Sequence, residues 1–175
     1  MAWTAPKTFA VGETLTAAEM NTNVRDNTLA LKNPPADETL VDAATEVTYA
    51  TASTWADIDA TNLIVTITTT GGDVMIGFAG PLTNDTVDEG VYLDVARDQG
   101  GAQVRFAGDD GITAITAAKA AYAENASFVI IWTGLAAGTW NFKMQWKVEV
   151  GTARFWRGQG GGAVKFHAQF WAREI

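Results

Sequence analysis

The sequence predicts a mainly β protein, in which an N-terminal extended arm and a short helix precede an antiparallel β-sandwich or jelly roll. Residues 139–150 and 164–172 alternate strictly between apolar and polar side chains, as half-buried antiparallel strands do. Glycine-rich turns separate these segments from the other candidate strands. The alanine-rich residues 112–125 suit either a short helix or a loop with weak strand character. Many short strands joined by short turns favour a sandwich or jelly roll.

Composition narrows the class of protein further. The 175 residues suit one domain with a small appendage, and 47% of them are hydrophobic, enough for a core. The chain contains no cysteine, which excludes disulfides, thiolate catalysis and zinc–thiolate sites. The longest apolar run, residues 128–132, is far too short to span a bilayer, and the N-terminus lacks a signal-peptide pattern. We therefore expect no membrane insertion.

Charge is distributed unevenly along the chain. The net charge of −8 combines −12 over residues 1–126 with +4 over residues 127–175. An acidic surface repels phosphates, so we expect no nucleic-acid partner. The basic C-terminal part is interpreted as lysines that alternate with core residues on a sheet, with a binding face as the alternative.

The N-terminal helix has a well-defined beginning and end. Residues 1–15 are expected to be extended. Thr16 and Glu19 form a capping-box pattern, in which each side chain bonds the other residue's backbone N–H. The helix is expected to run to about Leu31, because Pro34 and Pro35 cannot continue it.

The apolar residues of this helix form a narrow seam rather than a broad face. They recur at spacings of three and four, with one polar member: Ala17, Met20, Val24, Asn27 and Leu31. A helix this short is marginally stable in water unless something packs on its seam. We therefore interpret the seam as a contact between three copies of the chain or with a larger assembly.

The remaining elements are expected to be strands. Residues 33–44 are interpreted as a linker or first loop, so that residues 1–37 form the arm, helix and linker, and residues 38–175 form the sandwich. The candidate strands are residues 45–51, 63–69, 74–80, 90–97, 102–107, 126–133, 139–150 and 164–172.

The two clearest strands predict a shared core. The expected buried stripe consists of Trp140, Phe142, Met144, Trp146 and Val148, facing Val164, Phe166, Ala168 and Phe170. A hairpin is the simplest connection between them, although a jelly roll can place them in different sheets. Lys147 lies on the opposite, polar side of its strand and is expected to meet solvent.

No reaction centre is evident. The only histidine, His167, lies on the polar side of its expected strand, and a single imidazole supports neither a metal cluster nor a Ser–His–Asp triad. The glycine-rich residues 158–165 lack the P-loop pattern. We expect no catalytic residues, no metal, no cofactor and no enzymatic activity. Aromatic residues on polar faces favour contacts with another subunit or with sugar, and the candidates are Trp156, His167 and Trp171.

One pattern in the N-terminal segment is distinctive: Trp3-x-x-Pro6, Phe9, Gly12-Glu13, Leu15-Thr16-Ala17, Met20-Asn21 and Val24-Arg25-Asp26-Asn27. It resembles the N-terminal segment of many tailed-bacteriophage structural proteins of the fibre, spike or appendage type. The likeness covers about 32 residues, and in such proteins the segment precedes a β-rich body. The C-terminal part, from Leu135 to Ile175, is similar in style to small trimeric jelly-roll heads on viral fibres.

The resemblance implies a structural protein of the virion that is assembled in the host cytoplasm. Such a protein would form a homotrimer and would bind other virion proteins of the capsid, neck or tail. Trp3, Pro6, Phe9 and Leu15 would then attach the chain to the virion. A capsid decoration protein is one alternative, and a carbohydrate-binding module that contacts host-surface glycan is another. A small glycosidase would need two carboxylates facing each other across a cleft.

Overall fold

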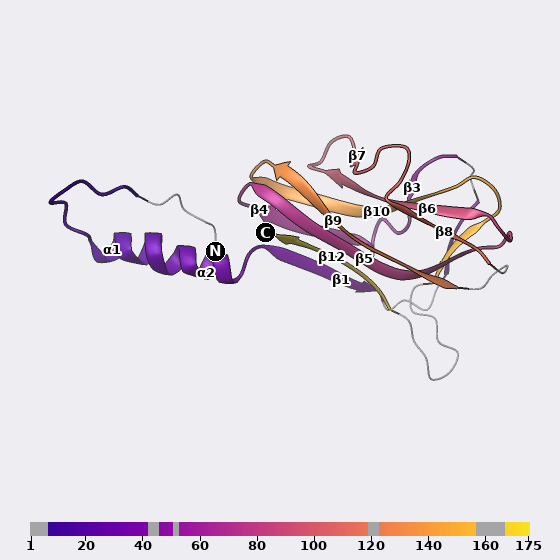
Figure 1. Ribbon diagram of the computed structural model, residues 1–175, viewed down its shortest axis with the longest axis horizontal. Coiled ribbons are helices and arrows are strands. Elements are labelled where there is room, and N and C mark those ends of the chain that lie inside the picture. Colours follow the sequence, from indigo (N-terminus) through magenta and orange to yellow (C-terminus); the bar gives the residue numbers. More distant parts are fainter. Residues whose placement is uncertain (1–6, 42–45, 51–52, 119–122, 157–166) are drawn as a thin grey trace.

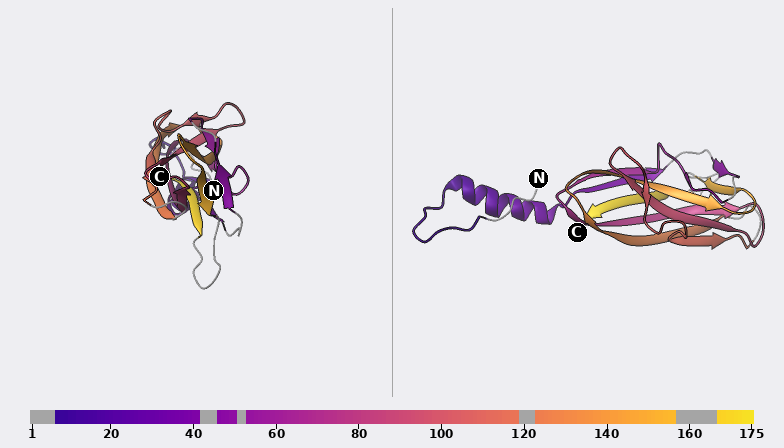
Figure 2. Two further views of the ribbon diagram at one scale, coloured as in Figure 1. Left: turned by 90° about the vertical axis from the view of Figure 1, so that its right-hand side faces the viewer. Right: turned by 90° about the horizontal axis from the view of Figure 1, so that it is seen from above.

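The molecule is elongated, with a helix projecting from one end of a β-sandwich (Figure 1). The computed structural model describes residues 7–41, 46–50, 53–118, 123–156 and 167–175. The C-terminus lies at the end of the sandwich nearest the helix, as the view from above also shows (Figure 2). The mainly β fold predicted from the sequence, a short helix followed by antiparallel sheets, is confirmed.

The helix begins at the predicted capping box. Thr16 Oγ1 accepts the Glu19 N–H at 3.2 Å, and the Glu19 carboxylate accepts the Thr16 N–H at 2.9 Å. The helix ends at Lys32, because Asn33 leaves helical geometry immediately before Pro34. Its successive parts are α1 (Ala17–Met20), a π-helical turn η1 (Asn21–Asp26) and α2 (Asn27–Lys32).

The π-helical turn was not predicted by the sequence pattern. The side-chain amides of Asn23 and Asn27 donate to the carbonyls of Glu19 and Asn23, at 3.0 and 3.3 Å. The Thr28 hydroxyl donates to the Val24 carbonyl at 2.7 Å. Side-chain bonds of this kind compete with the regular α-helical ladder for the same carbonyls.

Over the described residues, the sandwich consists of two antiparallel sheets, each of six strands. In sheet A, β5 pairs with β9 along one edge and with β12 and then β11 along the other; β1 lies outside β12, and β2 lies outside β11. The bounds are β1 (Ala36–Val41), β2 (Glu46–Tyr49), β5 (Gly72–Asn84), β9 (Glu124–Leu135), β11 (Ala153–Trp156) and β12 (Ala168–Glu174).

Sheet B is built around β10 and β6, which pair along most of their length. Beyond β10 lie β3 and β4, and beyond β6 lie β7 and β8. The bounds are β3 (Ala56–Asp57), β4 (Ile64–Thr69), β6 (Gly90–Asp98), β7 (Val104–Arg105), β8 (Thr113–Thr116) and β10 (Gly138–Val148).

The order of the strands is that of a jelly roll. The chain alternates between sheets, passing from β1 and β2 to sheet B, back to β5, then to β6, β7 and β8, then to β9, β10 and finally β11 and β12. Late strands are inserted between early ones: β12 lies between β1 and β5, and β10 lies between β4 and β6. Two nested Greek keys of this form define the jelly roll.

The core lies between the sheets, where the predicted stripe of β10 is buried from Phe142 to Val148. Trp146 is 1% exposed and stacks on Tyr49, with ring centres 5.8 Å apart. On β12, the inward residues Ala168, Phe170 and Ala172 are buried as expected. Trp140 is only half-buried, at the end of the stripe, whereas Val164 and Phe166 lie outside the described residues.

Two expectations about connectivity are wrong. Residues 139–150 and 164–172 do not form a hairpin, because β10 belongs to sheet B and β12 to sheet A, with β11 between them in the chain. The segment 33–44, interpreted as a linker or loop, contains β1, which pairs with β12 from Ala36 to Val41. Only Val41 of β1 is buried, so the apolar alternation that marks the other strands is missing.

The polar side of β10 is also not a solvent-facing surface. Lys147 lies half-buried over two rings, with Nζ 5.4 Å from the ring centre of Trp55 and 5.1 Å from that of Tyr92. Its ammonium donates to the Asp109 carbonyl at 3.0 Å. Gln145 is buried as well, and its amide donates to Gln103 at 2.7 Å. The segments 53–57 and 99–112 of the same chain therefore cover this face.

Candidate interaction surfaces

The N-terminal arm folds back along the helix. The Lys7 N–H donates to Asn23 Oδ1 at 3.2 Å, and the Lys7 ammonium pairs with Glu13 and Glu19. The bond from Lys7, together with those from the Thr16 backbone and hydroxyl, lowers the pKa of Glu19 to about 2. Of the predicted attachment residues, Phe9 and Leu15 are exposed, while Trp3 and Pro6 lie outside the described residues.

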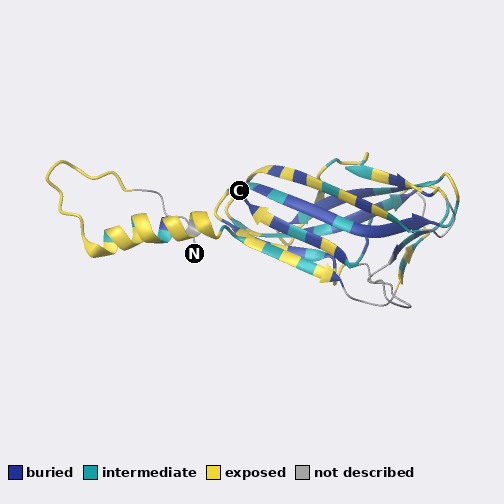
Figure 3. Cartoon of the chain, turned by 60° about the horizontal axis from the view of Figure 1, so that its bottom comes forward, coloured by how far each residue is buried: buried dark blue, intermediate teal, exposed yellow. Residues whose placement is uncertain are grey.

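The predicted helix seam is divided by the π-helical turn. Ala17, Met20, Val24 and Leu31 are exposed, and Leu31 is the most exposed of them at 71%. Asn27 is only 4% exposed, and its amide bonds the carbonyl of Asn23, the residue that the arm contacts. The polar member of the seam is thus buried and its apolar members are exposed. Figure 3 shows that most of the helix is exposed.

A second apolar surface covers the outer side of sheet A. It consists of Leu40, Met75, Gly77, Val129, Ile131 and Trp171, and is called the Trp171 face below. In the sheet register, Trp171 pairs with Gly77, which pairs with Val129, and Met75 pairs with Ile131. Leu40 lies opposite Gln169, and Met75 lies opposite Arg173, so polar residues adjoin the face on the β12 side. Val129 and Ile131 are 61% and 47% exposed, and Leu40 is exposed on β1. The face is therefore apolar across neighbouring strands and open.

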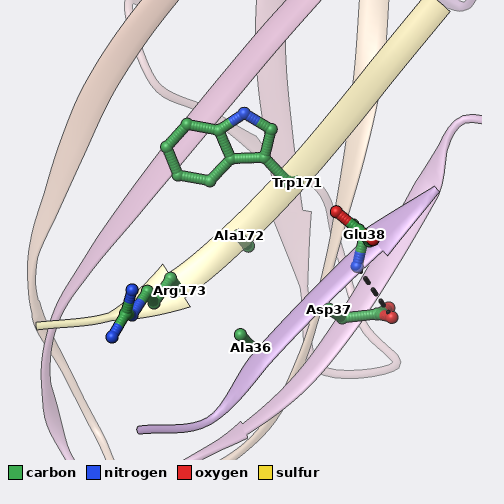
Figure 4. A pocket seen from close by; sticks show the side chains of 6 residues that line it. All are labelled: Ala36, Asp37, Glu38, Trp171, Ala172 and Arg173. Atoms are coloured by element: carbon green, nitrogen blue, oxygen red, sulfur yellow. Dashed lines mark hydrogen bonds between the residues drawn. The ribbon is translucent and has the colours of Figure 1, made fainter. Parts of the chain in front are cut away.

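Trp171 holds its position because the opposite residue has no side chain. A Cβ atom on Gly77 would lie 2.3 Å from Trp171 Cζ2, so the indole lies against the backbone of β5. Beside it, a shallow cavity of about 450 Å³ lies between β1 and β12 and is flanked by Glu38 and Arg173 (Figure 4). Trp171, Glu38 and Arg173 therefore place one aromatic, one acidic and one basic side chain at the margin of the Trp171 face.

The structure does not gather Trp156, His167 and Trp171 into one described site. His167 is half-buried and precedes the first residue of β12 rather than lying within the strand. The backbone of Trp156 ends β11 and pairs with Glu46, and its side chain lies outside the described part of the chain. Trp171 alone contributes to a described surface.

The acidic turns have structural roles. Asp85 accepts the Thr152 N–H at 2.8 Å, and this bond lowers the pKa of the carboxyl below its usual range. Asp109 pairs with Arg105 at 2.6 Å. Within the residues that the structure describes, no three acidic or histidine side chains gather in a way that would hold a metal ion. No described helix is long and apolar enough to cross a membrane.

The Trp171 face was missed at the level of sequence, although a signal for it exists. Residues 128–132 form an apolar run without alternation, which indicates a strand that is apolar on both sides. Ile130 and Trp132 face the core, and Val129 and Ile131 face outward. The run was interpreted only as too short for a membrane span.

Comparison with known proteins shows no family model that matches the chain, and no curated protein matches it. Among solved structures, the chain is similar to one of infectious bursal disease virus, Gx strain, with a TM-score of 0.38 and 12% sequence identity. The similarity covers 79% of this chain and 35% of that one, so the chain spans about a third of the length of the structure it matches. A TM-score of this size does not establish a common fold.

Proposed function

We propose that this chain is a non-enzymatic structural component of a bacteriophage virion, a homotrimeric fibre, spike or appendage protein attached by its N-terminal arm and helix. The observation that carries the proposal is the pair of uncovered apolar surfaces: the exposed residues of the helix and the Trp171 face. The resemblance of residues 3–27 to the attachment segments of such proteins supplies the biological setting.

The Trp171 face supports self-association. Apolar residues that adjoin one another on a surface mark a contact more often than isolated ones do. The strand β9 that carries Val129 and Ile131 pairs only with β5 among the described strands, so it also presents an open sheet edge. A closed symmetric assembly buries both features at once, and the trimer is the closed form that the resemblance favours.

The arm and helix support attachment. They extend from the end of the sandwich and make no extensive contact with either sheet in the described part of the chain. The chain joins the sandwich immediately after the helix, where the Pro35 carbonyl accepts the Glu174 N–H at 2.9 Å. Residues before Pro34 are therefore available to bind another surface.

Self-association is tested by the mass in solution. Light scattering of the purified chain at micromolar concentration should give the mass of a trimer, and a monomer mass would contradict the proposal. Ile131→Lys should shift the population toward monomers, because it places a charge on the Trp171 face. Thr116→Lys, on exposed β8 of the other sheet, adds the same charge and should leave the mass unchanged.

Attachment is tested by deletion. A chain that lacks residues 1–32 should remain a soluble β protein and should no longer join virus particles. Normal incorporation of the shortened chain would show that the arm is not the anchor. A capsid decoration protein would use the same arm and body, and a density map of the intact particle distinguishes that role by placing the chain on the head lattice, the neck or the tail.

A further inference from the structure

An unusual cation lies near one end of the central strand β6 of sheet B, separate from the surfaces described above. Arg97 is near the end of β6 and points inward, between the ends of β9 and β10. Its guanidinium carbon is 4.7 Å from the ring centre of Trp132 and 4.8 Å from that of Trp140. Trp132 is buried and Trp140 half-buried, so the two indoles hold Arg97 at the rim of the core.

Arg97 has no acidic partner among the residues that the structure describes. Arg105 and Arg154, by contrast, pair with carboxylates at 2.6 and 2.7 Å. The adjacent Asp98 is engaged elsewhere, because it accepts the Asn141 amide at 3.0 Å and pairs with Lys143 at 3.2 Å. In an acidic protein, a half-buried guanidinium that lacks a carboxylate has its charge available for an anion from outside.

The donors of Arg97 are also available. All the N–H bonds of a guanidinium lie in its plane, so contacts with ring faces do not use them. Beside Arg97 lies a cavity of about 380 Å³, within the usual size range of small-ligand sites. Its lining consists of Arg97, Asp98, Gln99, Gly100, Gly101, Ala102, Val104 and Trp140. The Asp98 carboxylate in this lining is already engaged by Asn141 and Lys143.

We propose that this cavity binds the carboxylate of an acidic saccharide, with Arg97 as the bidentate donor. The planar guanidinium matches the geometry of a carboxylate. One face of the Trp140 indole carries Arg97, and the part of this half-buried indole outside that stack is where the C–H face of a sugar ring would pack. Gln99 would offer an amide to the sugar hydroxyls. A neutral sugar lacks the charge that Arg97 needs, and a simple carboxylate lacks the ring that Trp140 needs. The site rests on β6, the turn at residues 99–102, β7 and β10, and does not depend on the proposed virion role.

The test uses the full chain and three probes: glucuronic acid, glucose and acetate at one pH and salt concentration. Calorimetric titration should show binding of glucuronic acid that is about tenfold or more tighter than that of either other probe. The indole N–H signals of Trp132 and Trp140 should shift in NMR spectra during the titration. If acetate binds as tightly as glucuronic acid, the cavity is a simple anion site and the sugar ring contributes nothing. If glucose binds as tightly as glucuronic acid, Arg97 does not recognise the carboxylate.

Variants locate the site. Arg97→Lys keeps the charge and removes the planar fork, so it should weaken binding of glucuronic acid about tenfold or more. Arg154→Lys is the matched control on β11 of sheet A, where Arg154 pairs with Glu46, and it should bind as the unaltered chain does. Unchanged binding by Arg97→Lys, or no binding of glucuronic acid at tens of millimolar, would overturn the proposal. If Arg97→Lys fails to fold, the comparison of the three probes on the unaltered chain decides the outcome.

Discussion

The outer faces of the two sheets differ in solvent exposure, and the difference is the opposite of what their residue types suggest. The outer face of sheet B is polar, yet Asp94 and Gln145 are buried on it, because residues 53–57 and 99–112 of the same chain cover it. The outer face of sheet A is apolar around Trp171, yet Val129 and Ile131 remain exposed. Alternation along a strand thus identifies the side that faces the core, and it does not identify whether the other side meets water.

The contrast has a physical basis in hydrogen bonding. A polar face can be covered by an irregular segment if each buried polar group finds a partner there. The Asp94 carboxylate accepts the Ala107 N–H at 3.2 Å, and the Gln145 amide donates to Asp57 at 2.7 Å. Most of the face is paired in this way, although Gln145 Oε1 and Trp55 Nε1 are buried without a hydrogen-bond partner. No described segment of the chain covers the Trp171 face, and the proposed self-association rests on this exposure.

The core shared by both sheets should give the largest effect on stability. Trp146→Ala is expected to lower the free energy of unfolding by about 3–5 kcal/mol, because it leaves a large cavity beside Tyr49. Chemical denaturation of the variant and the unaltered chain measures the difference. A loss below about 1 kcal/mol would mean that the interior collapses around the missing ring.

The Trp171 face should be sensitive to its glycine. Gly77→Ala is expected to cost about 1–3 kcal/mol, because the new methyl group would overlap the indole of Trp171 and displace it. Gly101→Ala is the control, since a Cβ there meets open space. Thermal unfolding measures both changes. A loss at Gly77 no greater than at Gly101 would show that the indole moves aside freely.

Lys147 distinguishes a covered face from a solvated one. We expect Lys147→Ala to cost about 1–2 kcal/mol, since it removes the contacts with Trp55 and Tyr92 and the bond to Asp109. Glu149→Ala, just beyond β10 and exposed, should change stability by less than about 0.5 kcal/mol. Equal small effects in denaturation experiments would restore the solvent-facing interpretation of this face.

Two acids on the covered face should respond to pH with opposite signs. Burial raises the pKa of Asp94, so the folded state holds its proton more strongly and its contribution to stability is lost as pH rises from about 3.9 through the folded pKa. The bond from Asn141 lowers the pKa of Asp98, so its contribution is present above about 3.9 and is lost as pH falls through the folded pKa.

The matched variants make this difference measurable. Between pH 3 and pH 7, the unaltered chain should lose stability relative to Asp94→Asn and gain stability relative to Asp98→Asn. Denaturation curves at several pH values compare the three proteins. The same slope for both variants would contradict the opposite environments of the two carboxyls.

Several parts of the fold could be predicted from local patterns. The capping box placed the start of the helix at Thr16, and strict alternation identified the buried side of β10 from Phe142 to Val148. These features depend on residues close together in sequence. The jelly roll was reached only as a class, because the insertion of β12 between β1 and β5 depends on pairings between distant segments.

Other parts lacked a local signal. β1 buries only Val41 and has no apolar alternation, so its pairing with β12 defines it. The cover over Lys147 comes from Trp55 and the segment near Asp109, both far from β10 in sequence. For the candidate surfaces, the sequence identified Trp171 but not its apolar neighbours on β5 and β9, since register across strands is not visible in one segment.

The place of β12 within sheet A has a consequence for how the protein is made. Ala36 pairs with Arg173, so the backbone groups of β1 that bond to β12 have no strand partner until β12 is present. Contacts this far apart in sequence make folding slow. During synthesis, sheet A cannot complete this pairing until β12 has been made, whereas the residues of the helix and its capping box are present much earlier. The helix can therefore form before the sandwich that follows it has folded.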